Sequence, residues 1–249
     1  MCSAESIRSI DSVGVSAILH TSSPCWISPR ASCRVIFFEG ILPPEPTVKR
    51  TYAFIDGQNL FYAAKNAFGY TFPNYEPVSL AQMLCQLKGW QLSQIYFYTG
   101  IPEVRDSPFW NHFWTKKLAY MGTRSVKAFS RHLKYRNQTV NLPSGGTTTV
   151  LVGQEKGVDV RLALDVVRFA REDCYDVAVI FSQDQDLSEV AMEVRSIASG
   201  QNRWIKIACA FPASPTYGNR RGINSTDWIP IDRATYDRCI DANDYRPVI

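Results

Sequence analysis

The sequence predicts an α/β protein whose mainly parallel sheet is flanked by helices. From Thr51 onward, short apolar runs alternate with segments in which apolar residues have helical spacing, and this alternation is typical of strand–helix–strand units. Two of the apolar runs also end in carboxylates, at Asp56 and at Asp184. Open α/β sheets build their sites at the carboxyl ends of parallel strands, so the second observation agrees with the first.

The first 49 residues differ from this pattern. They are rich in Ser and Pro, end in Pro43-Pro44-Glu45-Pro46, and have no sustained helical or strand period. We therefore expect residues 1–49 to be a poorly ordered extension, either a tail or a partner-binding arm, unless the true start lies near Val48. Residues 50–249 are expected to form the folded domain with a C-terminal tail.

The first half of the domain is expected to open with a buried strand at residues 52–55, after which Asp56-Gly57 turns the chain into a helix. The aromatic residues Phe109, Trp110, Phe113 and Trp114 recur at helical spacing, so we expect them to be packed more than exposed. The remaining elements predicted here are helices at 80–87 and 109–120 and strands at 94–98 and 125–129.

The second half is expected to begin with a hairpin. Residues 134–140 and 147–152 are strand-like and are separated by a turn sequence, Asn-Leu-Pro-Ser-Gly-Gly, at 141–146. Helices are then predicted at 158–171 and 187–197, and strands at 177–181, 204–209 and 228–231.

Carboxylates follow or precede the apolar elements at several points. Asp56 ends the first strand and Asn59 lies three residues later, where it could fix a ligand or cap the helix. Asp184 and Asp186, one residue apart, follow the strand at 177–181, a spacing that lets two oxygens approach one hard cation. Each of these acids could instead be a helix cap favoured by the helix dipole.

Two further acids lie on the helix predicted at 158–171. Asp159 continues its apolar stripe, so we expect the side chain to point inward, towards the sheet. Asp165 shares a polar stripe with Arg161 and Arg168, which favours ion pairing and leaves Asp165 a lesser candidate for a site.

Acids gathered in one cleft repel one another, and burying them is costly unless a cation is bound. The set of Asp56, Asp159, Asp184 and Asp186 therefore predicts a site for Mg²⁺ or Mn²⁺, which prefer oxygen ligands.

Positive charge is concentrated between Ser107 and Gln154, a segment with no Asp or Glu. Basic groups neutralise phosphates and aromatic faces stack on unpaired bases, so this mixture suits a nucleic-acid strand. A solvated basic face over core aromatic residues is the alternative. The basic candidates are Lys116, Lys117, Arg124, Lys127, Arg131, Lys134 and Arg136.

Other classes of protein are disfavoured. No stretch approaches the roughly 20 apolar residues of a membrane span, and the apolar patch at 13–19 follows Glu5 and Asp11 rather than a basic flank, unlike a secretory signal. The 7 cysteines are scattered and never closely paired, so we interpret them as reduced thiols in the cytoplasm. Phosphate-loop and Gly-x-Ser-x-Gly motifs are absent from the sequence.

Three motifs occur in a family's order: Phe54-Ile55-Asp56-Gly57-Gln58-Asn59-Leu60, Lys156-Gly157-Val158-Asp159-Val160, and Ser182-Gln183-Asp184-Gln185-Asp186. Together they resemble the NYN domain, a branch of the PIN-like nuclease superfamily, over roughly residues 51–232. The resemblance implies a Rossmann-like three-layer α/β/α sandwich. It also implies a divalent-metal ribonuclease site in which Asp56, Asp159, Asp184 and Asp186 match the acidic cluster and Asn59 its supporting polar group.

Together with the resemblance, the reduced thiols and the basic segment predict a cytoplasmic RNA endonuclease. We expect its substrate to be single-stranded or looped RNA, since the deep groove of duplex RNA hides its bases. One departure from the family is Gln183, where Gly is usual, because a side chain there could narrow the cleft or alter the turn. A regulator that keeps the fold and binds nucleic acid without cleaving it is therefore the alternative. A partner-docking protein that works through residues 1–49 is a third reading.

Overall fold

The computed structural model describes residues 43–141, 145–216 and 219–247. Most of the predicted N-terminal extension, residues 1–42, lies outside the described residues. Within the described part, residues 43–49 precede the first strand without forming a helix or strand of their own.

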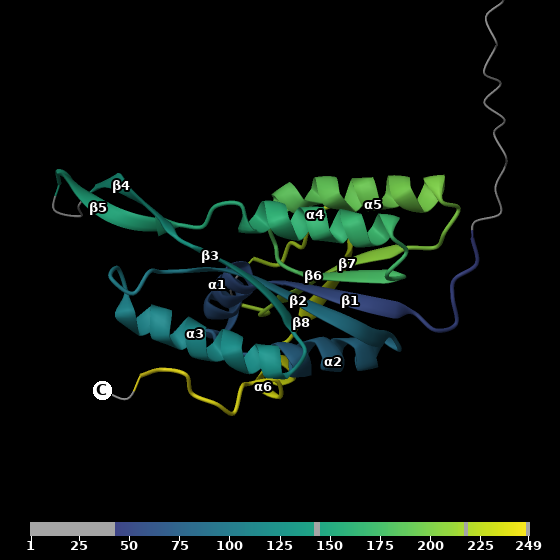
Figure 1. Cartoon of the computed structure of the whole chain (residues 1–249), viewed down its shortest axis with the longest axis horizontal. Helices are drawn as coiled ribbons and strands as arrows, with labels where there is room; N and C mark the ends of the chain where they lie inside the picture. The colour runs from purple at the N-terminus through teal and green to yellow at the C-terminus, as the bar shows by residue number, and fades with distance from the viewer. Residues whose placement is uncertain (1–42, 142–144, 217–218, 248–249) are drawn as a thin grey trace, which may run out of the picture. The chain divides into compact units, whose positions relative to one another are not determined.

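The centre of the domain is a six-stranded sheet with the order β3-β2-β1-β6-β7-β8, in which every neighbouring pair is parallel. Chain order thus runs outward from β1 in one direction and then from β6 in the other, which is the doubly wound arrangement. The order in which the chain adds strands changes direction between β1 and β6, which lie next to each other in the middle of the sheet (Figure 1). We call this place the switch point. The strands are β1 (Arg50–Asp56), β2 (Gln91–Ile101), β3 (Lys127–His132), β6 (Val177–Phe181), β7 (Lys206–Pro212) and β8 (Asp227–Ile231).

Helices cover both faces of the sheet. Because side chains alternate between faces along a strand, Ala53 and Ile55 of β1 join one apolar core while Phe54 joins the other. The first core contains α1 (Gly57–Phe68), α2 (Pro77–Lys88), α3 (Pro108–Thr123) and the short α6 (Arg233–Asp237). The second contains α4 (Val158–Arg171) and α5 (Ser188–Gly200), with a 3₁₀ turn, η1 (Gln185–Leu187), before α5.

The predicted three-layer α/β/α architecture is therefore confirmed. The predicted hairpin is present too, as β4 (Lys134–Asn141) paired antiparallel with β5 (Thr147–Gln154). It forms a separate two-stranded sheet that projects from the body beside β3 (Figure 1). The helix α6 was not expected; it has only five residues and is capped by Asp232, whose carboxylate accepts a hydrogen bond from the Thr235 amide.

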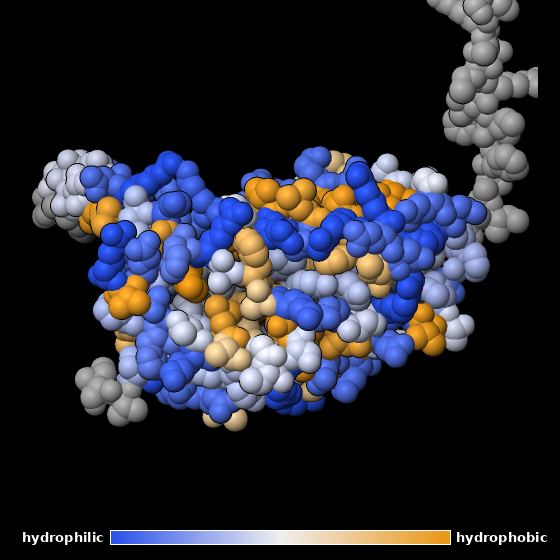
Figure 2. Space-filling view, viewed as in Figure 1, coloured by the Kyte–Doolittle hydropathy of each residue, from blue (hydrophilic) through white to orange (hydrophobic). Residues whose placement is uncertain are grey.

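Apolar side chains also reach the outer surface of the α4–α5 layer. Figure 2 shows apolar residues over these helices, where Val160, Leu164 and Met192 are exposed. The inward side of α4 carries Leu162 and Val166, which are buried. Within the described ranges, no helix combines the length and the apolar content that crossing a membrane requires.

The aromatic stripe of α3 is packed as expected at Phe113 and Trp114, which are buried. Phe109 and Trp110 are only partly buried. On the same helix, Lys117 is fully buried: its ammonium donates to the Tyr75 carbonyl at 2.7 Å and to the Asp241 carboxylate at 2.9 Å. Lys117 cannot reach a phosphate in this position, so its assignment to the nucleic-acid-binding set is wrong.

Replacing Lys117 with Met is expected to lower the free energy of unfolding by about 3–5 kcal/mol, because it leaves the Asp241 carboxylate buried without its cation. The adjacent Lys116 is exposed, so Lys116→Met should change stability by less than about 0.5 kcal/mol. Chemical denaturation of both variants measures the difference. Equal stabilities would contradict a structural role for Lys117.

Candidate active site

Asp56 lies at the end of β1, at the switch point of the sheet, and caps the N-terminus of α1. One carboxylate oxygen accepts a hydrogen bond from the Asn59 amide at 3.0 Å, and the other lies 3.4 Å from the Ser182 hydroxyl. Only 9% of the residue is exposed. Burial raises the pKa of Asp56 to about 6, and the charges of Asp184 and Asp159 raise this pKa as well, although the two hydrogen bonds oppose the shift.

The turn from β1 into α1 depends on Gly57. A Cβ atom at this position would lie 2.5 Å from the Phe97 ring of β2 and 3.1 Å from the Tyr98 carbonyl. Glycine therefore lets the N-terminus of α1 approach β2 closely, which keeps Asp56 at the edge of the sheet.

The loop after β6 is tied to the same place. The Asn59 side-chain oxygen accepts a hydrogen bond from the Gln183 amide at 2.8 Å, so Asn59 joins α1 to this loop. The Ser182 hydroxyl, which faces Asp56, also accepts from the Asp184 amide at 3.2 Å. These bonds fix the backbone that carries Asp184 relative to Asp56.

The other predicted acids differ in their surroundings. The Asp184 carboxylate accepts from the Asp186 amide at 3.1 Å and caps η1, whereas Asp186 itself is exposed. Asp159 lies in the first turn of α4 and is exposed, so the expectation that it points inward to the sheet is wrong. Its charge nevertheless contributes to the raised pKa of Asp56.

The donor chemistry suits a hard cation, because every candidate ligand is a carboxylate and the buried Asp56 is destabilised by its acidic neighbours. A ready-made coordination shell is not present: across residues 43–141, 145–216 and 219–247, no three acidic, His or Cys side chains are grouped closely enough to hold a metal. Asp184, Asp186 and Asp159 would therefore have to move towards a bound ion.

Asp165 has a different role from these acids. Its carboxylate is buried and accepts hydrogen bonds from Tyr98, Arg161 and Arg168, at 3.0, 2.9 and 3.0 Å. Both oxygens are occupied by this network, which agrees with the ion-paired interpretation from the sequence. The network stabilises α4 against β2 and leaves Asp165 without a free oxygen for a metal.

One acid near the site was missed in the sequence. Glu155 accepts a hydrogen bond from the Gly100 amide at 2.6 Å. Burial raises its pKa to about 7, and the charges of Asp56 and Asp159 add to the shift, against the effect of the Gly100 bond. A Cβ atom at Gly100 would lie 2.8 Å from the Glu155 carboxylate, so Gly100 permits the approach. The signal was the position of Glu155, directly before the Lys156-Gly157-Val158-Asp159 motif.

Two glutamines hold the loop before β8 against the site. The Gln183 side chain donates to the carbonyls of Asn219 and Arg221 at 2.8 and 2.9 Å, and the Gln185 side chain donates to the Gly222 carbonyl at 2.9 Å. Gln183 therefore fastens a loop that carries the exposed Arg220 and Arg221. Arg220 and Arg221 were not predicted as site residues, because nothing in the sequence indicates that their loop lies against the segment after β6.

The basic candidates other than Lys117 are exposed on α3, on β3 and on the hairpin, and within the described part of the chain they form no ion pair with an acid. Arg131 lies at the start of α4: a Cβ atom at Gly157 would be 2.7 Å from its guanidinium. The exposed candidates are Lys116, Arg124, Lys127, Arg131, Lys134 and Arg136.

Comparisons with known proteins identify a family. A sequence model of the NYN domain matches residues 50–201. Among solved structures, a protein of unknown function from Vibrio parahaemolyticus is similar at 12% identity and a TM-score of 0.45, over 76% of this chain and 97% of that chain. Ribokinase from Giardia lamblia is similar at 12% identity and a TM-score of 0.36, over 74% and 58% of the two chains. A comparison with curated proteins finds no match.

Asp56→Asn is expected to stabilise the metal-free protein at neutral pH. A carboxyl whose pKa is higher in the folded state stabilises below its unfolded pKa, and this contribution is lost as pH rises through about 6. The variant should therefore equal the wild type near pH 4 and exceed it by about 1–3 kcal/mol above pH 6. Denaturation in EDTA across this pH range measures the gap.

Asp186→Asn is the matched control, because Asp186 is exposed. It should open a much smaller gap over the same pH range. If Asp56→Asn were less stable than the wild type at every pH, the hydrogen bonds to Asp56 would outweigh its burial and the repulsion from its neighbours.

Proposed function

The chain belongs to the NYN domain family, and from that membership we propose that it is a divalent-metal-dependent RNA endonuclease that hydrolyses phosphodiester bonds. NYN domains are a branch of the PIN-like nuclease superfamily. The observation that carries the proposal is the position of the buried Asp56 at the switch point of the sheet, where the Ser182 hydroxyl contacts both its carboxylate and the Asp184 amide. The charges of Asp184 and Asp159 raise the pKa of Asp56 at this place, which is where α/β folds bind ligands.

Asp56, Asp159, Asp184 and Asp186 are the proposed ligands for Mg²⁺ or Mn²⁺. When bound, such a cation supplies Lewis acidity, which lowers the pKa of a nearby water and neutralises charge on the phosphate. The surrounding residues contribute orientation: Asn59 and Ser182 fix the backbone after β6 and hold the Asp56 carboxylate in place. No side-chain nucleophile is required.

The proposed substrate lies along the basic side of the domain. Exposed cations on α3, β3 and the hairpin carry no acidic partners in the described chain, so they are free to neutralise phosphates. Arg131 is a leading candidate, because its guanidinium lies against Gly157, two residues before Asp159. Arg220 and Arg221 are held near Asp184 by Gln183 and are further candidates for phosphate contact. We propose single-stranded or looped RNA, since the deep groove of an RNA duplex hides its bases.

We also propose that the protein is cytoplasmic and that residues 1–49 are an extension to the nuclease domain. Cys85, Cys174, Cys209 and Cys239, the cysteines among the described residues, are free thiols, in keeping with a reducing compartment.

The second candidate function is a regulator that binds nucleic acid without cleaving it. The observation that favours it is Gln183, which stands where the family usually has Gly and holds the loop at Asn219 and Arg221 against the site. A loop fastened there could restrict the approach of the scissile phosphate. The two candidates differ in one property, the metal-dependent formation of products.

Incubation of the full chain with labelled single-stranded RNA should give cleavage products in Mn²⁺ and none in EDTA. Asp184→Asn should reduce the rate by roughly a hundredfold or more, because even the residues that support metal ligands contribute about 10–100-fold. Glu172→Gln removes an exposed acid at the far end of α4 and should cleave at the wild-type rate.

Tight RNA binding without products would establish the regulator instead. Equal cleavage by the wild type and Asp184→Asn would mean that the activity comes from another site or a contaminant, and would overturn the proposed mechanism.

A further inference from the structure

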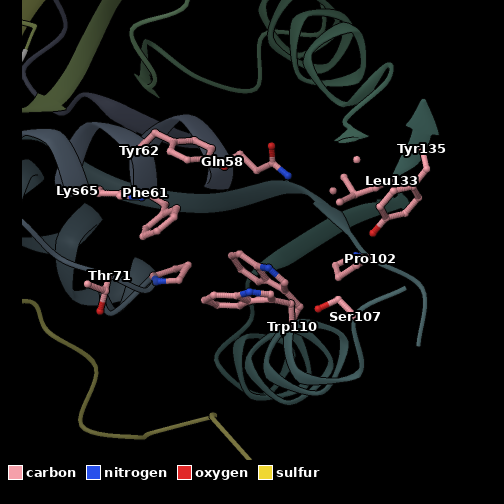
Figure 3. A pocket seen from close by; sticks show the side chains of 14 residues that line it. Gln58, Phe61, Tyr62, Lys65, Thr71, Pro102, Ser107, Trp110, Leu133 and Tyr135 are labelled. Carbon is pink, nitrogen blue, oxygen red and sulfur yellow. The ribbon is translucent and has the colours of Figure 1, made fainter. Parts of the chain in front are cut away.

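A pocket of about 370 Å³ lies between α1, α3, the end of β2 and the base of the β4–β5 hairpin. Its size lies within the range of small-ligand sites, about 300–1,000 Å³. Aromatic side chains from three elements line it: Phe61 and Tyr62 from α1, Trp110 and Trp114 from α3, and Tyr135 from β4. Figure 3 shows four of these rings around the pocket, those of Phe61, Tyr62, Trp110 and Tyr135. The proposed metal site makes no use of any of these rings.

Some of the aromatic side chains that line the pocket are packed against the core, and others are exposed to solvent. Trp110 packs edge-on against the buried Phe113, with ring centroids 5.4 Å apart and an angle of 77° between the planes. Trp114 is only 6% exposed, whereas Tyr62 is 54% exposed. Rigid aromatic faces that remain reachable from solvent are suited to stacking on a planar ring.

Hydrogen-bonding groups in the pocket have no partners within the described chain. The side-chain amide of Gln58 and the indole N–H groups of Trp110 and Trp114 make no hydrogen bond to another described residue. The Trp114 N–H is not sealed from solvent, since Tyr245 has the only enclosed, unpartnered side-chain polar atom among the residues described. These donors can pair with acceptors on the edge of a heterocycle.

The pocket adjoins the acidic site through two of its walls. Gln58 is two residues beyond Asp56 on α1, and Gly100, at the end of β2, donates its amide proton to Glu155. The negative charges of Asp56 and Asp159 contribute to the raised pKa of Glu155. The pocket and the acidic residues therefore share α1 and are joined through the Gly100–Glu155 hydrogen bond at the end of β2.

Charge around the pocket also favours a phosphate-linked ligand. Lys65 lines the pocket, is exposed and has no acidic partner among the described residues. The nearby acids Glu103 and Asp106 are both paired with Arg105, at 2.9 and 3.8 Å. Lys134 and Arg136, on the strand that supplies Tyr135, add exposed positive charge.

We infer that this pocket binds one unpaired nucleobase of the RNA strand, stacked on Trp110 and Tyr62, and so places the adjoining phosphate at the acidic residues. The inference rests on the proposed function for the identity of the strand. It narrows the substrate to RNA in which a base next to the scissile bond is unstacked, because a base inside a duplex cannot enter the pocket.

The test is a binding measurement in EDTA, where cleavage cannot occur, with fluorescently labelled single-stranded RNA and the full chain. Trp110→Ala should weaken binding roughly tenfold or more, the effect of removing one stacking platform. Phe109→Ala, which removes the neighbouring ring outside the pocket, should bind as the wild type does. Tyr62→Ala, at an exposed position, should also weaken binding and serves as the second variant if Trp110→Ala does not fold.

A second series replaces one nucleotide at a time by an abasic residue. For the wild type, one position should weaken binding more than the others, and Trp110→Ala should remove this difference. If Trp110→Ala and Tyr62→Ala bind like Phe109→Ala, or if the abasic effect persists in Trp110→Ala, the inference is overturned.

Addition of Mn²⁺ to the same reactions separates this inference from the proposed function. If cleavage occurs but does not depend on Trp110, on Tyr62 or on the presence of a base at any one position, the proposed nuclease function stands and the base-binding role of the pocket is rejected. If binding depends on Trp110 and on one base but no cleavage occurs, the base-binding role of the pocket stands and the proposed nuclease function is rejected.

Discussion

The main physical constraint on the candidate site is the electrostatic cost of burying the Asp56 carboxylate close to other acids. Parallel strands β1 and β6 end side by side at the switch point, so the carboxylates that follow them share one edge of the sheet. The hydrogen bonds from Asn59 and Ser182 offset this cost only in part, because the pKa of Asp56 remains raised to about 6. A cation would remove the remaining unfavourable energy, which is the physical basis of the metal site that we propose.

Much of the fold was predictable from local patterns. The apolar runs that became β1 and β6 and the helical spacing of α4 are strong signals, and α4 and β6 have the predicted bounds. The grouping of Asp56 with Asp184 also followed, since both come directly after buried parallel strands.

Features that depend on tertiary partners were not predictable. Lys117 lies in an acid-free basic segment and looks like a phosphate ligand, yet its partner is Asp241, far along the chain. Asp159 was expected to continue the apolar stripe of α4, but the buried face of this helix begins at Val158 and continues through Leu162, so that Asp159 lies off it and is exposed. Glu155 is partly buried, and its carboxylate reaches the Gly100 amide because Gly100 has no side chain in its path. For Lys117 and Glu155 the deciding contact comes from a segment whose position the local sequence does not encode.

The acidic residues are connected to two neighbouring features of the domain. Gln183 and Gln185, which flank Asp184, hold the loop that bears Arg220 and Arg221, and α1, which Asp56 caps, supplies one side of the aromatic pocket. Crystals soaked in Mn²⁺ and measured at the manganese absorption edge test most directly whether a cation binds between these parts. The account predicts an anomalous peak shared by the carboxylates of Asp56 and Asp184; a peak only elsewhere, or no peak at saturating Mn²⁺, would contradict it.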